Sequence, residues 1–472
     1  MSNLSSGFID LATFDDVESF LYAGPTAVTY FIRQHKKSSW FTQVPVVLTQ
    51  SSGTPDFGAS WSVNISRAGD YLLHTWLEVT TPAVTAGSTN TPLNFWCKNF
   101  MHNLIEECSI TFNDLIAHKM DNVALDFWAA FNVPAGKREA YKKMIGAGTF
   151  SSDGQFVVGI SAAQAQTFVL PLPFFFTRES GVALPTAAIP YNDMRINFKF
   201  RALADVLATY ESATSLIPVA SAVTTGYVVP STKMTAKVYA NYAIVSNDER
   251  QLMGSTPRDI VIEQNQSAPI TTLSSATAVK AYDIRFSHAV KTLNFAIRNK
   301  RLYAAAVQNA AAPGIGGYGG DFFSNYTRKS VAQETAAQAA TTAAIGVPYI
   351  RKSAISSASL LYENTTRLSD LPSSYFTRVN PYYHQTTIPL EDGIHSYSYS
   401  LDSSSIDPMG STNYGKLTNV SLSITPASGI VLTTGAAAAT DDLTAASCDV
   451  VICAVNHNVI RVSGGAVGFP VL

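Results

Sequence analysis

The sequence is poor in charged residues. Of 472 residues only 14% are Asp, Glu, Lys or Arg, whereas about 25% is typical of soluble domains. The formal net charge is −2 and the isoelectric point is near 6.4, so no basic excess favours general binding to nucleic acid. Such a low charge is typical of a protein whose surface is largely covered by other subunits. No direct contact with nucleic acid is expected.

Cysteines and long apolar runs are also scarce. The four cysteines include no C-x-x-C pair and are too few for a disulfide framework. They are Cys97, Cys108, Cys448 and Cys453. The N-terminus lacks the basic and apolar regions of a signal peptide. The apolar run at 167–176 is broken by Pro171 and Pro173, well short of the ~18–20 residues of a membrane span. We therefore expect free thiols in a protein made in the reducing cytosol.

Motifs for catalysis and metal binding are missing as well. The eight histidines show no zinc-like spacing, and no Walker A, G-x-S-x-G or Cys–His signature occurs. Residues 314–319 match G-x-G-x-x-G, but without the flanking strand and helix of a dinucleotide site. The pairs Glu106-Glu107 and Asp441-Asp442 are interpreted as solvated, because neighbours in a strand point in opposite directions. The sequence predicts no enzyme activity, no cofactor and no metal.

An unbroken two-residue alternation at 193–201 is the clearest structural signal. Apolar residues occupy the even positions from Met194 to Phe200, and polar residues occupy the odd positions from Asp193 to Arg201. Successive side chains of a strand point to opposite faces. The segment is therefore predicted to be a strand with one face in a core and the other toward water or a partner.

Strand-like segments of this kind form two series. In the first, Asn113-Asp114 predicts a tight hairpin, and two helices are predicted at 122–131 and 134–146. The second series begins at Lys233, and a phase break at 288–291 predicts a turn or bulge. Residues 303–347 are rich in Ala, Gly and Thr and are expected to form long surface loops with at most a short helix.

Length and pattern together predict two β-sandwiches, because 472 residues exceed one ordinary core. We assign residues 1–24 to an N-terminal arm and 25–215 to the first sandwich. Residues 216–232 form the connector, and 233–472 form the second sandwich with its long loops.

The arm carries a helical pattern over 8–22, with Thr13 and Asp16 spaced like a helix cap. Two interpretations remain open: a helix packed on its own domain, or an arm that docks on a neighbouring subunit or on lipid. The apolar residues proposed for that interaction are Phe8, Ile9, Leu11, Phe14, Val17, Phe20 and Leu21.

Several segments together resemble the major capsid proteins of large icosahedral double-stranded DNA viruses, and among them the iridoviruses. They span nearly the whole chain in the order of that family. These segments are GFIDLATFDDVESFLY (7–22), SWFTQVPVVL (39–48), WSVNISRAGDYLLHTWLEV (61–79), NFMHNLIEECSITFNDLIAHKMDN (99–122), LPTAAIPYNDMRINFKFR (184–201), FSHAVKTLNFAIRN (286–299), YSYSLDSSSIDPMGSTNYGKLTNVSL (397–422) and AVNHNVIRVSGGAVG (454–468).

The resemblance implies an all-β double jelly roll, two eight-stranded antiparallel sandwiches in tandem with short helical insertions. It also implies homotrimeric capsomers in the outer shell of a virion, in contact with minor capsid and penton proteins. An internal membrane would lie beneath the shell, near the N-terminal arm, and synthesis and assembly would take place in the host cytoplasm. The family has no catalytic residues.

The expected function is therefore structural, by self-association into a shell. The alternative is a two-sandwich protein that binds or acts on carbohydrate. That alternative predicts a monomer with a cleft of opposed carboxylates and exposed aromatic side chains, whereas the capsid interpretation predicts a stable trimer.

Overall fold

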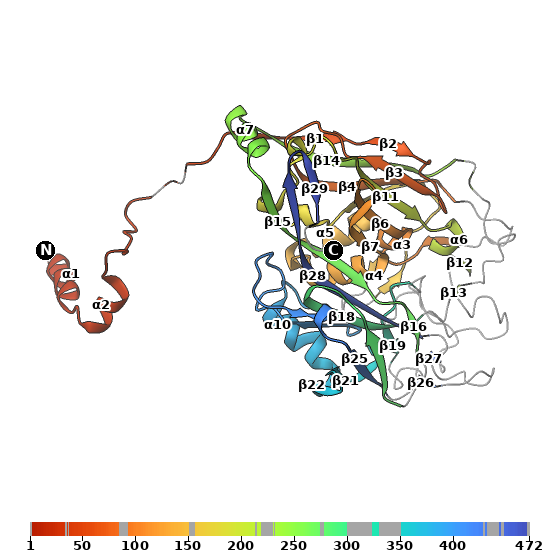
Figure 1. The fold of residues 1–472 in the computed structure, drawn as a ribbon. Helices are drawn as coiled ribbons and strands as arrows, with labels where there is room; N and C mark the ends of the chain where they lie inside the picture. The colour runs from red at the N-terminus through yellow and green to blue at the C-terminus, as the bar shows by residue number, and fades with distance from the viewer. Residues whose placement is uncertain are drawn as a thin grey trace. The chain divides into compact units, whose positions relative to one another are not determined.

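The strands of the computed structural model form two sandwiches of the same plan (Figure 1). Met1–Trp40 forms one compact unit of the chain, and Phe41–Leu472, which contains both sandwiches, forms another. The structure describes residues 2–33, 35, 37–84, 93–150, 156–212, 215–218, 230, 232–273, 278–299, 323–329, 351–427, 430–431, 443–444 and 448–469. No helix in these ranges is long and apolar enough to cross a membrane.

The first sandwich has eight principal strands in its described part. They are β1 (Phe41–Val47), β3 (Ser60–Asn64), β4 (Tyr71–Thr81), β6 (Ile105–Phe112), β7 (Leu115–Met120), β10 (Gln166–Pro171), β11 (Met194–Phe200) and β14 (Thr235–Val245). One sheet has the order β1-β14-β4-β10. The other has the order β2-β3-β11-β6-β7, in which β2 (Thr49–Ser52) is a short edge strand.

The second sandwich repeats this arrangement in the described part of its sequence. Its principal strands are β15 (Arg258–Ser267), β17 (Lys280–Ile284), β18 (Ala289–Asn299), β21 (Ile355–Tyr362), β22 (Thr365–Pro372), β23 (Ile394–Ser398), β25 (Val420–Pro426) and β28 (Cys448–Ser463). The sheets read β15-β28-β18-β23 and β17-β25-β21-β22. Numbered one to eight along the chain, the strands of both sandwiches therefore follow the orders 1-8-3-6 and 2-7-4-5. This is the jelly-roll plan, and the predicted double jelly roll is confirmed.

Shorter strands and several helices accompany the principal strands of the two sandwiches. The remaining strands are β2 (Thr49–Ser52), β5 (Leu93–Trp96), β8 (Thr149–Phe150), β9 (Phe156–Val158), β12 (Leu207–Ser212), β13 (Ser215–Pro218), β16 (Thr271–Thr272), β19 (Thr327–Lys329), β20 (Arg351–Ser353), β24 (Thr412–Asn413), β26 (Ile430–Val431), β27 (Leu443–Thr444) and β29 (Ala466–Gly468). The helices are α1 (Ser2–Ala12), α2 (Asp16–Tyr22), α3 (Phe100–Leu104), α4 (Asn122–Asn132), α5 (Ala135–Ile145), α6 (Leu203–Val206), α7 (Asn247–Ser255) and α10 (Asn380–His384). Single turns of other helix types are η1 (Phe175–Thr177), η2 (Ser180–Val182), η3 (Thr186–Ala188), η4 (Tyr375–Val379) and η5 (Tyr414–Lys416).

The boundary between the sandwiches lies later than the sequence pattern predicted. Strand β14, expected to open the second sandwich after Lys233, pairs with β1 and β4 of the first. The predicted connector at 216–232 thus precedes the last strand of the first sandwich. The chain passes to the second sandwich between Val245 and Arg258, through α7. An alternating strand pattern shows which face is buried but not which sheet the strand joins.

Strand β11 has the predicted two faces. Its four apolar side chains, Met194, Ile196, Phe198 and Phe200, are buried. The intervening polar side chains are partly or fully exposed. β11 lies between β3 and β6, so both of its edges are hydrogen-bonded within the sheet while its apolar face points into the core. The Trp61 ring of β3 stacks on Phe198 with centroids 5.5 Å apart.

The phase break at 288–291 combines the two predicted features. His288 has a φ of 63°, and this turn takes the chain from β17 in one sheet to β18 in the other. A bulge follows, because Val290 and Thr292 pair with Asn456 and Val455 while Lys291 has no place in the register. The extra residue is Lys291, which is 1% exposed.

The segment 303–347 was expected to form surface loops, but residues 324–327 within it are buried. Ser324 and Tyr326 are 1% and 2% exposed, and both donate hydrogen bonds to the first sandwich, as detailed below. Within the same segment, Thr327–Lys329 form the short strand β19. The G-x-G-x-x-G match at 314–319 and the parts of 303–347 other than 323–329 lie outside the described residues.

The hairpin predicted at Asn113-Asp114 is confirmed between β6 and β7. Both residues have positive φ, 48° and 66°, as a two-residue turn with the twist of a hairpin requires. Asn113 also ties the turn to the start of β11, because the backbone N–H of Asp193 donates to its Oδ1 at 2.7 Å.

Replacement of Asn113 by Val is therefore expected to lower the free energy of unfolding by about 2–3 kcal/mol, since a β-branched residue is strained at positive φ and the hydrogen bond is lost. Denaturant unfolding measures the change. Asp114→Gly is the matched control and should be neutral or slightly stabilising. Equal stabilities of the two variants would contradict the assignment of the turn.

Candidate functional site: the polar seam and the N-terminal segment

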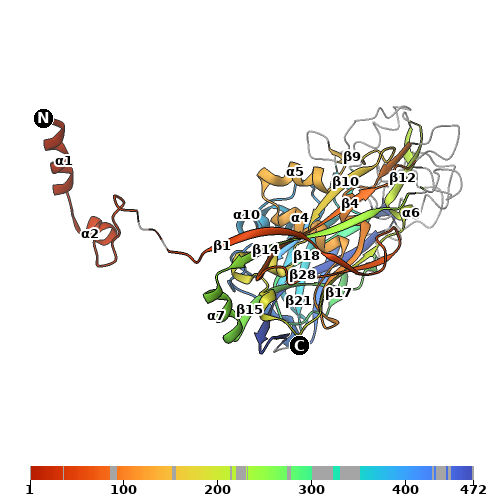
Figure 2. The ribbon, with the colours of Figure 1, turned by 90° about the horizontal axis from the view of Figure 1, so that it is seen from above.

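Six of the seven sequence-predicted interaction residues lie on two helices rather than one, and Phe14 lies in the break between these helices. The break falls at residues 13–15, between α1 and α2 (Figure 2). Asp15 instead of Thr13 caps the second helix by accepting the N–H of Asp16 at 2.8 Å. All seven proposed side chains are exposed, from 55% for Phe14 to 88% for Phe20. Leu4, which the sequence analysis did not single out, is 71% exposed on α1.

The two sandwiches meet at a buried seam built partly from apolar side chains. Helix α4 of the first sandwich contributes Phe127 and Phe131 to a cluster that contains Tyr326, Ile394 and further residues of the second. From the other side, strands β15 and β28 extend beyond the second sandwich (Figure 1). Four of their side chains, Ile260, Ile262, Ile460 and Val462, belong to the core of the first.

One carboxylate, that of Asp126 on α4, collects hydrogen bonds from both sandwiches. Nδ1 of His102 lies 2.7 Å from its Oδ1. The hydroxyls of Ser324 and Tyr326 donate to its Oδ2 at 2.6 and 2.8 Å. Burial alone would raise the pKa of Asp126, but the bonds from His102, Ser324 and Tyr326 outweigh it and hold the pKa below its usual value. Asp126 therefore stays ionised, and the hydrogen bonds from these partners compensate for the burial of its charge.

A lysine reinforces the same part of the seam. The ammonium of Lys98, just before α3, donates to both carboxylate oxygens of Glu391 at 2.6 and 2.8 Å and to the carbonyl oxygen of Ser324 at 3.2 Å. The side chain of Asn103 donates to the hydroxyl oxygen of Ser324 at 2.9 Å. Partners more than 220 residues apart in the chain are thus held together.

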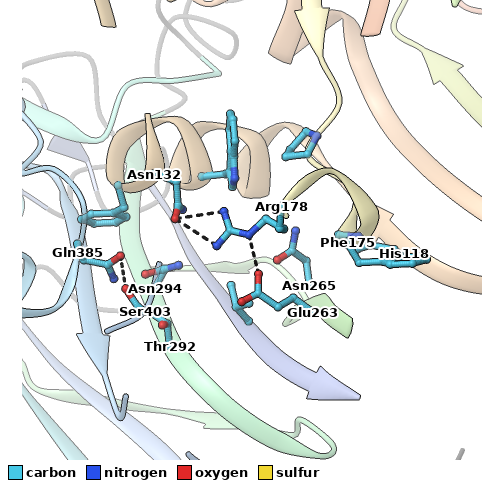
Figure 3. A pocket seen from close by; sticks show the side chains of 14 residues that line it. His118, Asn132, Phe175, Arg178, Glu263, Asn265, Thr292, Asn294, Gln385 and Ser403 are labelled. Atoms are coloured by element: carbon cyan, nitrogen blue, oxygen red, sulfur yellow. Dashed lines mark hydrogen bonds and ion pairs between the residues drawn. The ribbon is translucent and has the colours of Figure 1, made fainter. Parts of the chain in front are cut away.

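A second polar cluster surrounds a cavity of about 40 Å³ (Figure 3). Arg178, which follows η1, donates to Glu263 of β15 at 2.9 Å and to Asn132 of α4 at 3.4 Å. Lys291, the bulged residue of β18, donates to the other oxygen of Glu263. Burial would raise the pKa of Glu263, but the charges of Arg178 and Lys291 more than offset it and lower the pKa. Each charge is paired, as burial demands.

His118 of β7 lines the same cavity but, unlike Arg178 and Glu263, forms no ion pair within the described ranges. It is 4% exposed, and neither ring nitrogen has a hydrogen-bond partner among the described residues. Burial lowers its pKa to about 4, so the ring is neutral near pH 7. Burial also lowers the pKa of His395 in the second sandwich to about 4.

These groups hold the two sandwiches together and show no catalytic arrangement. The carboxylates of Asp126, Glu263 and Glu391 are engaged by structural partners, and the cavity is far smaller than the 300–1,000 Å³ of typical ligand pockets. Within the described residues no cluster of three or more His, Cys, Asp or Glu could hold a metal ion. The acidic pair Glu106-Glu107 forms surface ion pairs with Lys199 and Lys119. Asp441-Asp442 lie outside the described residues.

All four cysteines are buried free thiols. Burial raises the pKa of Cys97 to about 12 and also raises that of Cys108 and Cys453. A thiol held protonated is a poor nucleophile. These cysteines act as small apolar core residues.

Comparison with known proteins identifies the fold class first. The chain matches the solved capsid structure of the virus PBCV-1 with a TM-score of 0.70 at 21% identity, over 94% of this chain and 100% of the other. It matches the Faustovirus major capsid protein with a TM-score of 0.65 at 12% identity, over 93% of each chain. The fold is that of double jelly-roll viral capsid proteins.

Sequence comparison then gives the family. Two family models match: "Major capsid protein N-terminus" over residues 29–245 and "Large eukaryotic DNA virus major capsid protein" over 249–468. The major capsid protein of Costelytra zealandica iridescent virus is 47% identical, with 100% of this chain and 99% of the relative covered. That of Frog virus 3 is 40% identical with the same coverage. The chain belongs to the major capsid protein family of large eukaryotic DNA viruses, in its iridovirus branch. Its role as a structural component of the virion capsid, and not as an enzyme, is confirmed.

Nothing in the local sequence pattern marks the seam residues. Asp126 sits in an apolar helical segment, which is a weak signal of a buried carboxylate. Its partners Ser324 and Tyr326 lie in a stretch dominated by small residues. Only the fold brings the three together.

Removing the central carboxylate should therefore loosen the seam. Asp126→Ala is expected to lower the free energy of unfolding by about 3–5 kcal/mol, because His102, Ser324 and Tyr326 lose a buried acceptor. Denaturant unfolding measures this loss. Glu107→Gln, which removes an exposed ion pair with Lys119, is the control and should change stability by less than about 1 kcal/mol. A loss of similar size in both variants would refute the role of Asp126.

The buried histidines predict loss of stability in acid. The unfolded chain binds protons at His118 and His395 below pH 6.5, whereas the folded rings resist until about pH 4. Stability conferred by the neutral rings is thus complete above pH 6.5 and falls as the pH drops toward 4, by roughly 3 kcal/mol per ring. Unfolding measured between pH 7 and 4 should show this slope, and His118→Leu should reduce it. An unchanged slope in His118→Leu would contradict the prediction.

Proposed function

We propose that three copies of this chain form a capsomer and that capsomers tile the outer shell of an icosahedral virion. The observation that carries this function is the full-length match to iridovirus major capsid proteins together with two sandwiches of identical strand order. Three such chains around a threefold axis present six similar sandwiches in a near-hexagonal ring. A near-hexagonal unit tiles a flat facet with repeated, weak edge contacts, and many such contacts together stabilise a shell.

The seam supports this role. A tile must keep its two halves at a fixed angle so that its edges meet the edges of its neighbours. Paired buried charges at Asp126 and Glu263, set among apolar side chains, supply that fixed angle. A rigid chain also lowers the entropic cost of assembly.

Exposed apolar side chains support burial against other subunits. Tyr191, Tyr382, Tyr383 and Leu401 are each at least 68% exposed in the single chain. The rings of Tyr382 and Tyr383 lie edge to face with centroids 5.1 Å apart, and adjoining apolar side chains on a surface mark interaction sites. Their positions are in the sandwich unit, away from its two cores.

Further partners follow from the same proposal. Minor capsid proteins and penton proteins contact the capsomers, an internal membrane lies beneath the shell, and the N-terminal segment faces that inner side. The protein is made and assembled in the host cytoplasm. The alternative, a protein that binds or acts on carbohydrate, is not favoured because the full-length relatives are capsid proteins.

Light scattering on the purified chain tests the proposal. A stable species of three 50.7 kDa chains is expected, and a monomer that binds glycans would refute it. A chain without residues 1–24 should still form trimers, because the apolar side chains of that segment lie outside the two cores. It should fail to build larger assemblies or to associate with membrane. Failure of the shortened chain to fold would show that the segment is part of the core.

A further inference from the structure

We propose that the N-terminal segment of one copy, residues 2–32, docks into an apolar groove beside helix α5 of a neighbouring copy. This inference rests on the assembly proposed above and names the partner of the exposed segment. It is carried by a groove that the chain leaves open, by the charge of the helix beside it, and by the opposite charge of the segment.

The groove lies on the first sandwich and has a volume of about 460 Å³, within the range of ligand-binding sites. Strands β4 and β10 supply one wall, with Trp76 and Val169 among its residues, and helices α4 and α5 supply Trp128 and Met144. Trp76 stacks against Tyr239 of β14 with ring centroids 5.4 Å apart, which holds the indole in place. Met144 is 39% exposed. An aromatic-lined groove with a flexible methionine at its edge is suited to the apolar face of a helix.

Helix α5 makes one side of the groove basic. It carries Lys137, Arg138, Lys142 and Lys143 against a single acid, Glu139. Lys142 is used within the chain, by Glu139 at 2.9 Å and by the ring of Phe150. Lys137 and Lys143 are exposed. Lys137 stands seven residues before Met144, two helical turns away, and so shares the face of the helix that borders the groove.

The N-terminal segment is complementary to this surface. Residues 2–32 contain four acidic residues and no Lys, Arg or His; the acids are Asp10, Asp15, Asp16 and Glu18. The same segment exposes the apolar side chains of α1 and α2. Acidic and apolar groups together match a groove that is apolar with a basic flank.

The same charge makes a lipid surface the weaker partner. Helices that lie on membranes carry Lys and Arg on the polar face, because cytoplasmic leaflets are negatively charged. Here the first basic residue is Arg33, eleven positions beyond the end of α2. Four carboxylates on the helical segment would be repelled by anionic headgroups, whereas α5 attracts them.

Photo-cross-linking in the full chain tests the proposal. Phe20 is replaced by p-benzoylphenylalanine, and isotopically light and heavy copies are mixed, assembled and irradiated in the presence of vesicles of phosphatidylcholine and phosphatidylserine. Mass spectrometry is expected to find cross-links between copies, from position 20 to peptides that contain Trp76, Trp128 or Met144. Cross-links to lipid alone, to another surface, or only within one copy would overturn the inference.

Charge reversal supplies the matched variants. Lys137→Glu combined with Lys143→Glu should lower the yield of this cross-link about tenfold, as expected when two attractive contacts become repulsive. Asp10→Lys with Glu18→Lys, added in the same chain, should restore it. Lys280→Glu, an exposed lysine on β17 of the second sandwich, is the control and should leave the yield unchanged. Equal yields in the double reversal and the control would refute the role of α5.

Light scattering on the same samples separates this inference from the proposed function. A trimer without the cross-link overturns the proposed docking of the N-terminal segment in the groove but leaves the proposed capsomer standing. A monomer overturns the capsomer as well.

Discussion

The need to pair a buried carboxylate shapes much of this molecule. Asp126 is ionised inside the seam, and an uncompensated charge there would cost several kcal/mol. Its partners come from α3 and from the segment at 324–326. Satisfying one side chain therefore fixes two helices of the first sandwich and residues 324–326 of the second in a single arrangement.

Two kinds of contact hold the seam together: apolar packing and pairs of buried charged groups. Apolar side chains around α4 and along β15 and β28 are buried at the seam, and their removal from water supplies the driving force. The charged groups contribute less net energy but tolerate few alignments, because a shifted sandwich would leave Glu263 or Lys291 unpaired. The bulge that takes Lys291 out of the strand register is what places its ammonium at the seam.

The contrast between the sandwich unit and the N-terminal segment fits a protein that assembles. Charges in the seam are paired and its cavity is small, so the sandwiches present fixed surfaces. The segment at 2–32 leaves its apolar side chains exposed and concentrates acidic charge. If the segment docks on a neighbouring copy as proposed above, this contact needs no change in the sheets, because most preorganised interfaces keep their backbone conformation on binding.

Local chemistry in the sequence determined the elements of this fold. The alternation at 193–201, the turn at Asn113-Asp114 and the helices after residue 121 each follow from side-chain period or backbone preference, and each is present. Resemblance to a known family supplied the double jelly roll. Tertiary structure alone decided that β14 closes the first sandwich and that residues 324–327 are buried at the seam. Strand pairing joins residues about two hundred positions apart, and the ion pair of Lys98 with Glu391 joins residues 293 positions apart. No local pattern records which distant partner a polar side chain meets.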